Sequence, residues 1–571
     1  MNSGTRTIPD TPAVVVSQSV QVPPRRRKSR VLSVTASGNL AKRVLLSYER
    51  LLMSPYTAEE IFTHTPGYEW PGDYEGRALL AASRLSATSG MAHPLVETLD
   101  KGWERHVNRQ GYFGAIVSSG LADEQQLSSH GWVLRGLGAA YDVTGDPRWL
   151  VRGRRVVDGL TQGLKGLIAS YPLTPPSSGD RSGLHAGHLS QAIDGWRIST
   201  DVGCAFIFLD GLTSFYRHYA SEELRDLISA MAERFLLIDV VQAQAQTHAT
   251  LTACRALLRA ARILNRPDLI DSVESRFDLY LQYGSTALYQ NQNWFGRPSW
   301  TEPCAIVDAM MVAEHLWQAK GQFRHLKALH GIWYSGLGHA QRCNGGYGCD
   351  SCVGVRGHHV GISTPEAPWC CTMRGADGLA YAAASALRVV DKQISLGLLE
   401  SVQAELSLGG ERLQLKIDSG YPREGRLVVE VLSSSISESI CWRLPVLDDE
   451  DPIIRIDGIA HPVERVGQWS VFEFMPKAGS RIECTWRMAW TLDAWSHDSD
   501  RVRIQWGPLV LGSYSMPWLI GDQLHPERLE VSEPATLIDR VSGAVLRPLD
   551  DMVHRSMPDS TYQRQVLFRR G

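Results

Sequence analysis

Two short stretches of the chain carry side chains whose types and spacing could bind a metal. Glu302 and Cys304 stand two residues apart and offer a carboxylate and a thiolate. Cys370 and Cys371 are adjacent, and adjacent cysteines reach the geometry of a mutual disulfide only with strain. They are better explained as two ligands of one metal, or as a ligand beside a nucleophile. Three thiolates and one carboxylate would form a closed tetrahedral zinc site.

The alternative is that Cys370 and Cys371 are ordinary buried cysteines, which are common in protein cores. The surroundings of Cys304 favour the metal. Pro303 suits the first turn of a helix, and residues 375–387 also show a helical pattern. Because helix N-termini favour anions and lower the pKa of thiols, we expect two of them to present their ligands to one site.

The elements that must position these ligands are predicted to be helices. Residues 39–392 carry amphipathic patterns of short to medium length, without heptads or a fixed-period repeat. A row of about eleven or twelve such helices predicts an (α/α)6-type catalytic barrel, with a pocket on one rim. The expected helices cover 79–85, 95–103, 127–143, 147–167, 202–219, 222–238, 246–264, 268–283, 303–319, 324–338 and 374–390.

The segments before and after the helical region show different sequence patterns. Residues 393–571 contain alternating strand patterns, which indicate β-sandwich modules. Residues 1–38 mix Ser, Thr and Pro with a basic run at 25–28, and we predict that they are a disordered tail. The expected fold class is therefore multidomain α+β. The clearest strand patterns lie at 413–417, 426–431, 469–474, 481–486 and 502–506.

Composition excludes several partners. The 571 residues carry a formal charge of −3, whereas nucleic-acid-binding domains are strongly basic, so no nucleic-acid partner is expected. No stretch reaches the ~20 apolar residues of a membrane helix, and the N-terminus has no secretory signal pattern. We therefore expect a cytoplasmic protein whose reduced thiols are free to bind metal. A homodimer is compatible with the sequence.

The order and spacing of these residues resemble glycoside hydrolase family 127, the zinc-cysteine β-L-arabinofuranosidases. Members carry a Glu-x-Cys motif at a helix start and a Cys-Cys pair downstream. Here the Cys pair begins 66 residues after the motif cysteine (370 − 304 = 66). The run 246–262 is similar to the family's histidine-bearing helix, and the stretch 506–510 (WGPLV) is similar to one of its strands.

The resemblance implies a barrel followed by β-sandwich modules, with zinc as cofactor. Glu302, Cys304, Cys370 and Cys371 would hold the zinc. Cys370 would also be the nucleophile of a retaining glycosidase that acts on a small-molecule or oligosaccharide glycoside, as β-L-arabinofuranosidases do. His248 stands where the family places a histidine that contacts the substrate.

The sequence departs from the family at the general acid, which retaining hydrolysis requires. The family has a Glu shortly before its Glu-x-Cys motif, but residues 283–301 contain no carboxylate. Glu366 is our candidate because it is close to Cys370 in sequence, and Asp377 and Tyr289 are further candidates. The missing acid keeps two alternatives open. One is a sugar lyase or isomerase on the same scaffold, and the other is a non-catalytic carbohydrate-binding protein.

A cysteine-rich segment lies between the two motifs. Cys349 and Cys352 have the spacing of a zinc knuckle, and Cys343, His358 or His359 could complete a second site. The alternative is a Gly-rich loop over the pocket with incidental thiols.

Overall fold

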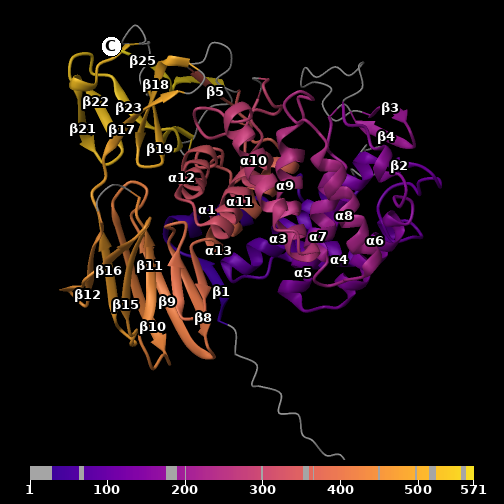
Figure 1. The fold of residues 1–571 in the computed structure, drawn as a ribbon, viewed down its shortest axis with the longest axis horizontal. Coiled ribbons are helices and arrows are strands. Elements are labelled where there is room, and N and C mark those ends of the chain that lie inside the picture. The colour runs from indigo at the N-terminus through magenta and orange to yellow at the C-terminus, as the bar shows by residue number, and fades with distance from the viewer. Residues whose placement is uncertain are drawn as a thin grey trace, which may run out of the picture.

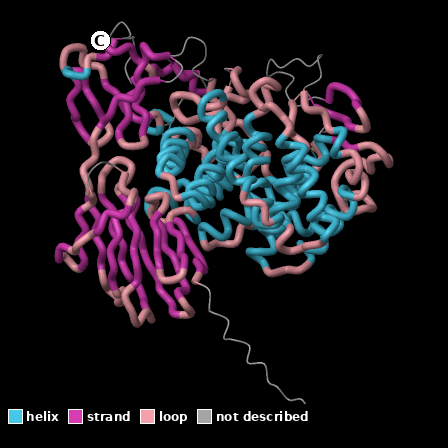
Figure 2. The backbone as a smooth tube through the Cα atoms, in the orientation of Figure 1, coloured by secondary structure: helices cyan, strands magenta, loops and turns pink. Residues whose placement is uncertain are grey.

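The structure is a computed structural model in which a helical part adjoins two groups of strands (Figures 1 and 2). The helices occupy the first two thirds of the chain, and the strand-rich region follows. The expected mixture of a helical part and a C-terminal strand-rich part is therefore confirmed. The structure describes residues 29–63, 70–174, 189–199, 201–297, 300–351, 359–363, 365–447, 451–495, 498–513, 523–553 and 561–571.

Within the described residues, six helices contact one another in a closed cycle. The order is α3, α5, α7, α9, α11 and α13, and α13 returns to contact α3. These helices span Asp73–Ser89, Glu124–Thr144, Phe206–Phe215, Thr247–Leu264, Pro303–Lys320 and Cys370–Ala384.

Further helices pack against this cycle, each beside the cycle helix that precedes it in the chain. The exception is α1, which contacts both α13 and α3 and so covers the place where the cycle closes. These outer helices are α1 (Gly38–Arg50), α4 (Pro94–His106), α6 (Arg148–Thr161), α8 (Glu222–Leu236), α10 (Asp268–Tyr283) and α12 (Phe323–Gly331).

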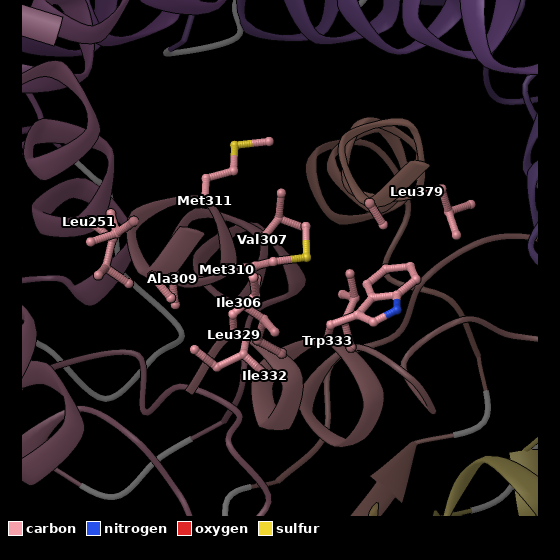
Figure 3. Packing of buried hydrophobic residues seen from close by; sticks show 14 of the residues in the cluster. Leu251, Ile306, Val307, Ala309, Met310, Met311, Leu329, Ile332, Trp333 and Leu379 are labelled. Atoms are coloured by element: carbon pink, nitrogen blue, oxygen red, sulfur yellow. The ribbon is translucent and has the colours of Figure 1, made fainter. Parts of the chain in front are cut away.

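Helix α11 is almost wholly buried because apolar residues occupy its whole circumference rather than one stripe. Figure 3 shows Ile306, Met310 and their neighbours on α11 between Leu251 of α9 and Leu379 of α13. Pro303 is the first residue of the helix, as expected, and Gly321 ends it in the left-handed conformation (φ +66°). Glu302 and Cys304 thus stand at the start of a helix that is enclosed on nearly all sides.

The strands form two large groups. The first contains a seven-stranded sheet and a five-stranded sheet. Alternate residues of β9, such as Leu413 and Leu415, share one hydrophobic core with Trp442 and Leu444 of β11. The seven strands are, in spatial order, β1 (Arg30–Ala36), β8 (Val402–Leu408), β9 (Glu411–Ser419), β10 (Arg426–Ser434), β16 (Arg481–Thr485), β12 (Ile453–Ile456) and β13 (Ile459–Ala460). The five are β14 (Glu464–Val466), β15 (Trp469–Phe474), β11 (Ile440–Pro445), β7 (Gln393–Leu396) and β6 (Leu387–Val390).

The second group is an eight-stranded sheet. It contains the strand expected at 502–506, as part of β18, and strands after residue 520, where the sequence predicts no individual strand. A strand from the same end of the chain, β24 (Thr561–Gln565), pairs with β5 (His359–Ser363) in the loop before α13. The eight strands are β20 (Gln523–Leu524), β25 (Phe568–Arg570), β18 (Asp498–Trp506), β19 (Leu509–Ser513), β23 (Val545–Pro548), β22 (Thr536–Asp539), β21 (Leu529–Glu533) and β17 (Trp490–Trp495).

The end of the predicted tail requires a correction. Residues 30–36 form β1, which pairs antiparallel with β8, so that Thr35 lies opposite Gln403 and Val34 opposite Ala404. The VLSVTA stretch has the β-branched residues of a strand, but an unpaired strand cannot be distinguished from an extended tail by its pattern alone. Residues 1–28 of the predicted tail lie outside the described residues.

Two helix boundaries also differ from expectation. Helix α13 begins at Cys370 rather than after the Cys pair, and it ends at Ala384, so that residues 387–390 form β6 instead of a last helical turn.

Among the described residues, no helix combines the length and the apolar character needed to cross a bilayer.

Candidate metal centre

The four residues expected to bind metal meet at one point. Ligand atoms of Glu302, Cys304, Cys370 and Cys371 all lie within 4.8 Å of one another. The Sγ atoms of Cys370 and Cys371 are 3.7 Å apart. Two sulfurs bound to the same zinc at about 2.3 Å would be separated by roughly 3.8 Å in a tetrahedral site. The spacing of the two thiols is therefore that of two ligands of one ion.

Two helix N-termini present this cluster. Glu302 is the N-cap residue of α11 and Cys304 lies in its first turn, while Cys370 and Cys371 open α13. The backbone N–H of Glu302 donates to Asn291 Oδ1 over 2.7 Å, which fixes the start of α11. Because both helix dipoles direct their positive ends at the cluster, they stabilise anionic ligands there.

A strained residue turns the chain into α13. Trp369 has a φ of +64°, a conformation that costs free energy for a residue with a side chain. Its indole stacks on Tyr74 of α3 with ring centroids 4.4 Å apart. Its backbone N–H donates to the hydroxyl of Tyr56 over 3.1 Å. These contacts hold the turn that aims Cys370 and Cys371 at the other two ligands.

The donor set fits a soft divalent cation such as zinc. Glu302 is buried, and its Oε2 atom has no hydrogen-bond partner among the described residues. Burial raises the pKa of Glu302 to about 7 and raises the pKa of the Cys304 thiol well above its usual range. A cation held by three thiolates and this carboxylate would satisfy the orphaned oxygen and keep the ligands ionised.

A cation of the protein itself also lies beside the cluster. The guanidinium of Arg77 on α3 is 3.6 Å from Cys304 Sγ and donates to Asp73 Oδ1 over 2.8 Å. Its carbon stands 4.1 Å from the ring centroid of Trp132 on α5. The sequence analysis overlooked Asp73 and Arg77, although their (i, i+4) spacing at the start of a helix is a recognisable ion-pair signal.

His248 lies in the same part of the molecule, on the first turn of α9. Its Nδ1 atom lies 2.9 Å from Asp308 Oδ2, and its ring stacks on Trp132 at 5.7 Å between centroids. Burial opposes ionisation of Asp308, but Arg374 and Arg255 hold its pKa well below the usual range. Nδ1–H therefore donates to an ionised carboxylate, and the buried Nε2 has no partner among the described residues.

An ionic layer follows one to two turns farther along the same helices. Asp308 Oδ1 accepts from Arg255 at 2.5 Å and from Arg374 at 2.6 Å. Asp377 Oδ2 accepts from Arg135 at 3.1 Å and also pairs with Arg374. All five side chains are at least 93% buried. This layer fills the interior of the helix cycle and fixes the helices that carry the ligands.

Three residues proposed as the general acid are placed elsewhere. Glu366 forms an ion pair with Arg50 and accepts from Thr372 Oγ1 at 2.9 Å, so it secures the loop before α13 instead of facing the cluster. Asp377 belongs to the ionic layer, where Arg135 and Arg374 overcome the effect of burial and hold its pKa below the usual value. The hydroxyl of Tyr289 accepts from Arg503 at 2.9 Å, in the strand-rich region. Each of the three is thus engaged by a cation of the protein.

The cysteine-rich segment contributes one thiol next to the cluster. Cys349 Sγ lies 3.6 Å from Cys371 Sγ. Tyr347 anchors the segment to α13, because its N–H donates to Thr372 Oγ1 and its ring fills the space beside Gly375, where a Cβ would come within 2.2 Å. Cys343 is exposed. Cys352 and His358 of the proposed second zinc site lie outside the described residues, and so does the side chain of His359.

Comparison with solved structures shows which proteins share this fold. A GH127 β-L-arabinofuranosidase from Geobacillus stearothermophilus T6 superposes with a TM-score of 0.71 at 12% identity, over 94% of this chain and all of that one. A second GH127 β-arabinofuranosidase gives 0.70 at 13% identity, over 95% of this chain and 98% of the other. No family model and no curated protein sequence matches the chain. The expected resemblance is therefore confirmed for the fold, along almost the whole length.

Proposed function

We propose that the protein is a retaining glycoside hydrolase, a divergent relative of the family 127 enzymes, with Cys370 as its nucleophile. The observation that carries this proposal is the convergence of Glu302, Cys304, Cys370 and Cys371 at two helix N-termini. The same proposal interprets the closed helix cycle as an (α/α)6-type barrel over 39–392, followed by β-sandwich modules over 393–571.

The metal would be zinc, held by Glu302, Cys304, Cys370 and Cys371. When bound, zinc keeps sulfur as a thiolate at neutral pH and makes it a better leaving group.

Residues of the protein itself would carry out the bond-making and bond-breaking steps. Cys370 Sγ would attack the anomeric carbon, so that a C–S bond forms as the glycosidic C–O bond breaks. Water would then displace the sulfur from the opposite face and restore the original anomeric configuration. Arg77, which is buried between Asp73 and Cys304, supplies a fixed positive charge beside the thiols.

The leaving oxygen needs a proton, and His248 is better placed than Glu366 to give it. Its Nε2 is buried and has no partner in the part of the chain that the structure describes, while Asp308 holds Nδ1 in the manner of a carboxylate that orients a catalytic imidazole. Asp73 and Asp201 are further acidic groups near the cluster, but Asp73 pairs with Arg77 and Asp201 accepts from the indole N–H of Trp294. In the second step the neutral Nε2 would accept a proton from the attacking water. His248 thus replaces the carboxylate that residues 283–301 lack.

A panel of aryl glycosides that includes a β-L-arabinofuranoside tests this function. Product stereochemistry is read by NMR on zinc-loaded protein. Retained configuration, lost in Cys370→Ala, supports the proposal. An unsaturated or rearranged product without solvent oxygen would instead establish a lyase or isomerase. Normal ligand binding by Cys370→Ser, with no turnover by the wild-type protein on any glycoside, would leave a carbohydrate-binding protein.

A further inference from the structure

A separate cavity of about 440 Å³ opens where the helical part meets both groups of strands. Its walls come from α12, from loops of the first strand group and from β18 of the second. Figure 1 shows α12 facing the place where the two strand groups adjoin. The cavity shares no lining residue with the cysteine cluster. Its volume is in the range of sites for small ligands, which commonly lie between domains.

Aromatic rings from three parts of the chain line the cavity. They belong to Tyr289, Tyr421 and Trp486, and the last two have ring centroids 5.9 Å apart at 48°. The indole N–H of Trp486 is buried and has no acceptor among the described residues. Because that N–H is closed off from the cavity, contact with a ligand rests on the rings, whose flat faces suit the C–H faces of a sugar.

Tyr289 is held in place before any ligand arrives. Its φ of +59° is unusual for a residue with a side chain. Arg503 donates to its hydroxyl over 2.9 Å and also stands 4.4 Å from its ring centroid. On the other side, a Cβ at Gly331 would come within 2.7 Å of the ring, so only glycine leaves room for it. A ring fixed this firmly loses little entropy when it binds a ligand.

The charge of the lining is one-sided. Lys327, Arg465 and Arg487 are exposed at the cavity, and among the residues that the structure describes no Asp or Glu lines it. Arg465 has a distant partner in Asp451, at 3.8 Å. Neither Lys327 nor Arg487 forms an ion pair within the described part of the chain. His330 adds no charge, because burial lowers its pKa to about 4. The cavity therefore favours an anionic ligand.

We propose that this cavity binds a sugar that carries one anionic substituent, such as a uronic acid or a sugar phosphate. The ring would lie against Tyr421 and Trp486, and the anion would lie near Lys327 and Arg487. The site is independent of the chemistry at Cys370.

Calorimetric titration of the full-length protein tests the proposal with four probes: galacturonate, digalacturonate, glucose 6-phosphate and the neutral disaccharide cellobiose. We expect an anionic probe to bind more tightly than cellobiose, and the carboxylate and phosphate arms identify the preferred anion. The double variant Lys327→Gln/Arg487→Gln should weaken that binding roughly 5- to 10-fold, whereas the control Lys477→Gln, at an exposed lysine outside the lining, should not.

Two further variants locate the ligand. Trp486→Ala should remove most of the binding, and Cys370→Ala should leave it unchanged even if the protein proves to be no glycosidase. The proposal fails if no anionic probe binds, or if cellobiose binds equally well. It also fails if binding is lost in Cys370→Ala and kept in the Lys327 and Arg487 double variant, because the ligand would then occupy the cysteine site.

Discussion

Asp308 lies one helical turn beyond Cys304 and holds His248 Nδ1 at 2.9 Å, so one face of α11 carries both a proposed metal ligand and the group that orients an imidazole. The same carboxylate forms ion pairs with Arg255 and Arg374, so it is ionised and cannot itself donate a proton. The proposed metal ligand Cys304 and the carboxylate that orients the proposed proton donor therefore lie on one helix, and Arg374 links that carboxylate to α13, which begins with the proposed nucleophile Cys370.

Replacing His248 by Ala should produce a loss that depends on the leaving group. With a poor leaving group, kcat/KM should fall about 10²- to 10⁴-fold, because the departing oxygen then needs a proton. With a 2,4-dinitrophenyl glycoside the loss should be much smaller. The measurement is a series of aryl glycosides of graded leaving-group pKa, with His315→Asn, on the same helix as Asp308, as control. An equal loss across the series would mean that His248 only binds substrate.

Cys304→Ser and Cys371→Ser should each lower zinc affinity more than about 100-fold. Loss of a hydrogen-bond partner of a metal ligand costs roughly 10- to 100-fold in affinity, and loss of the ligand itself costs more. Metal content after dialysis gives the answer by mass spectrometry, independently of activity. The matched control is Cys254→Ser, which alters a buried thiol of α9 outside the cluster. Full zinc content in both cluster variants would contradict the metal site.

Glu366→Gln should affect stability rather than chemistry. The side chains of Glu366 and Arg50 are each 11% exposed, so removing one charge leaves the other poorly compensated. We expect a loss of about 1–3 kcal/mol in the free energy of unfolding, with kcat almost unchanged on every leaving group. Denaturant titration measures the free energy of unfolding. Glu438→Gln, in a pair with both partners more than half exposed, should change stability by less than about 0.5 kcal/mol.

Stability should depend on pH through Glu124 of α5, whose pKa is raised to about 7 by burial. Because the folded state holds this proton more tightly than the unfolded chain does, its contribution is complete below about pH 4.5 and is lost as pH rises through 7. Linkage between protonation and folding limits the resulting loss of unfolding free energy to roughly 3 kcal/mol. The difference in unfolding free energy between wild type and Glu124→Gln, followed from pH 4.5 to 8, should shift by this amount. A constant difference would show that Glu124 has an ordinary pKa.

Local pattern was sufficient for most elements and for the four side chains of the cluster, Glu302, Cys304, Cys370 and Cys371. The helices expected at 222–238, 246–264 and 268–283 and the strands at 426–431 and 469–474 are present, because their periodicity reflects which face is buried. Cys304 and Cys370 could be assigned to one site because each lies at or next to the predicted start of a helix. This information is local, and a single sequence contains it.

The general acid and the charged interior could not be predicted in the same way. Asp308 and Asp377 look like ordinary helix carboxylates until their partners, Arg374 and Arg135, arrive from other helices of the cycle. Glu366 was chosen for being four residues from Cys370, but the chain turns at Trp369 and directs Glu366 toward Arg50. Which side chains meet inside a closed cycle depends on helix rotation, and local pattern does not specify it.

The pairing of β1 with β8 joins residues about 370 positions apart, and this has a consequence for the living cell. A ribosome that adds ~5–20 residues per second would expose Arg30–Ala36 for roughly 20–70 s before Val402–Leu408 is made. During that interval an apolar, β-branched strand has no native edge to join, while the helices between the two strands can already assemble. Chaperone capture of nascent chains is therefore expected to concentrate on this first strand, and the helical part must tolerate synthesis with its leading strand still unpaired.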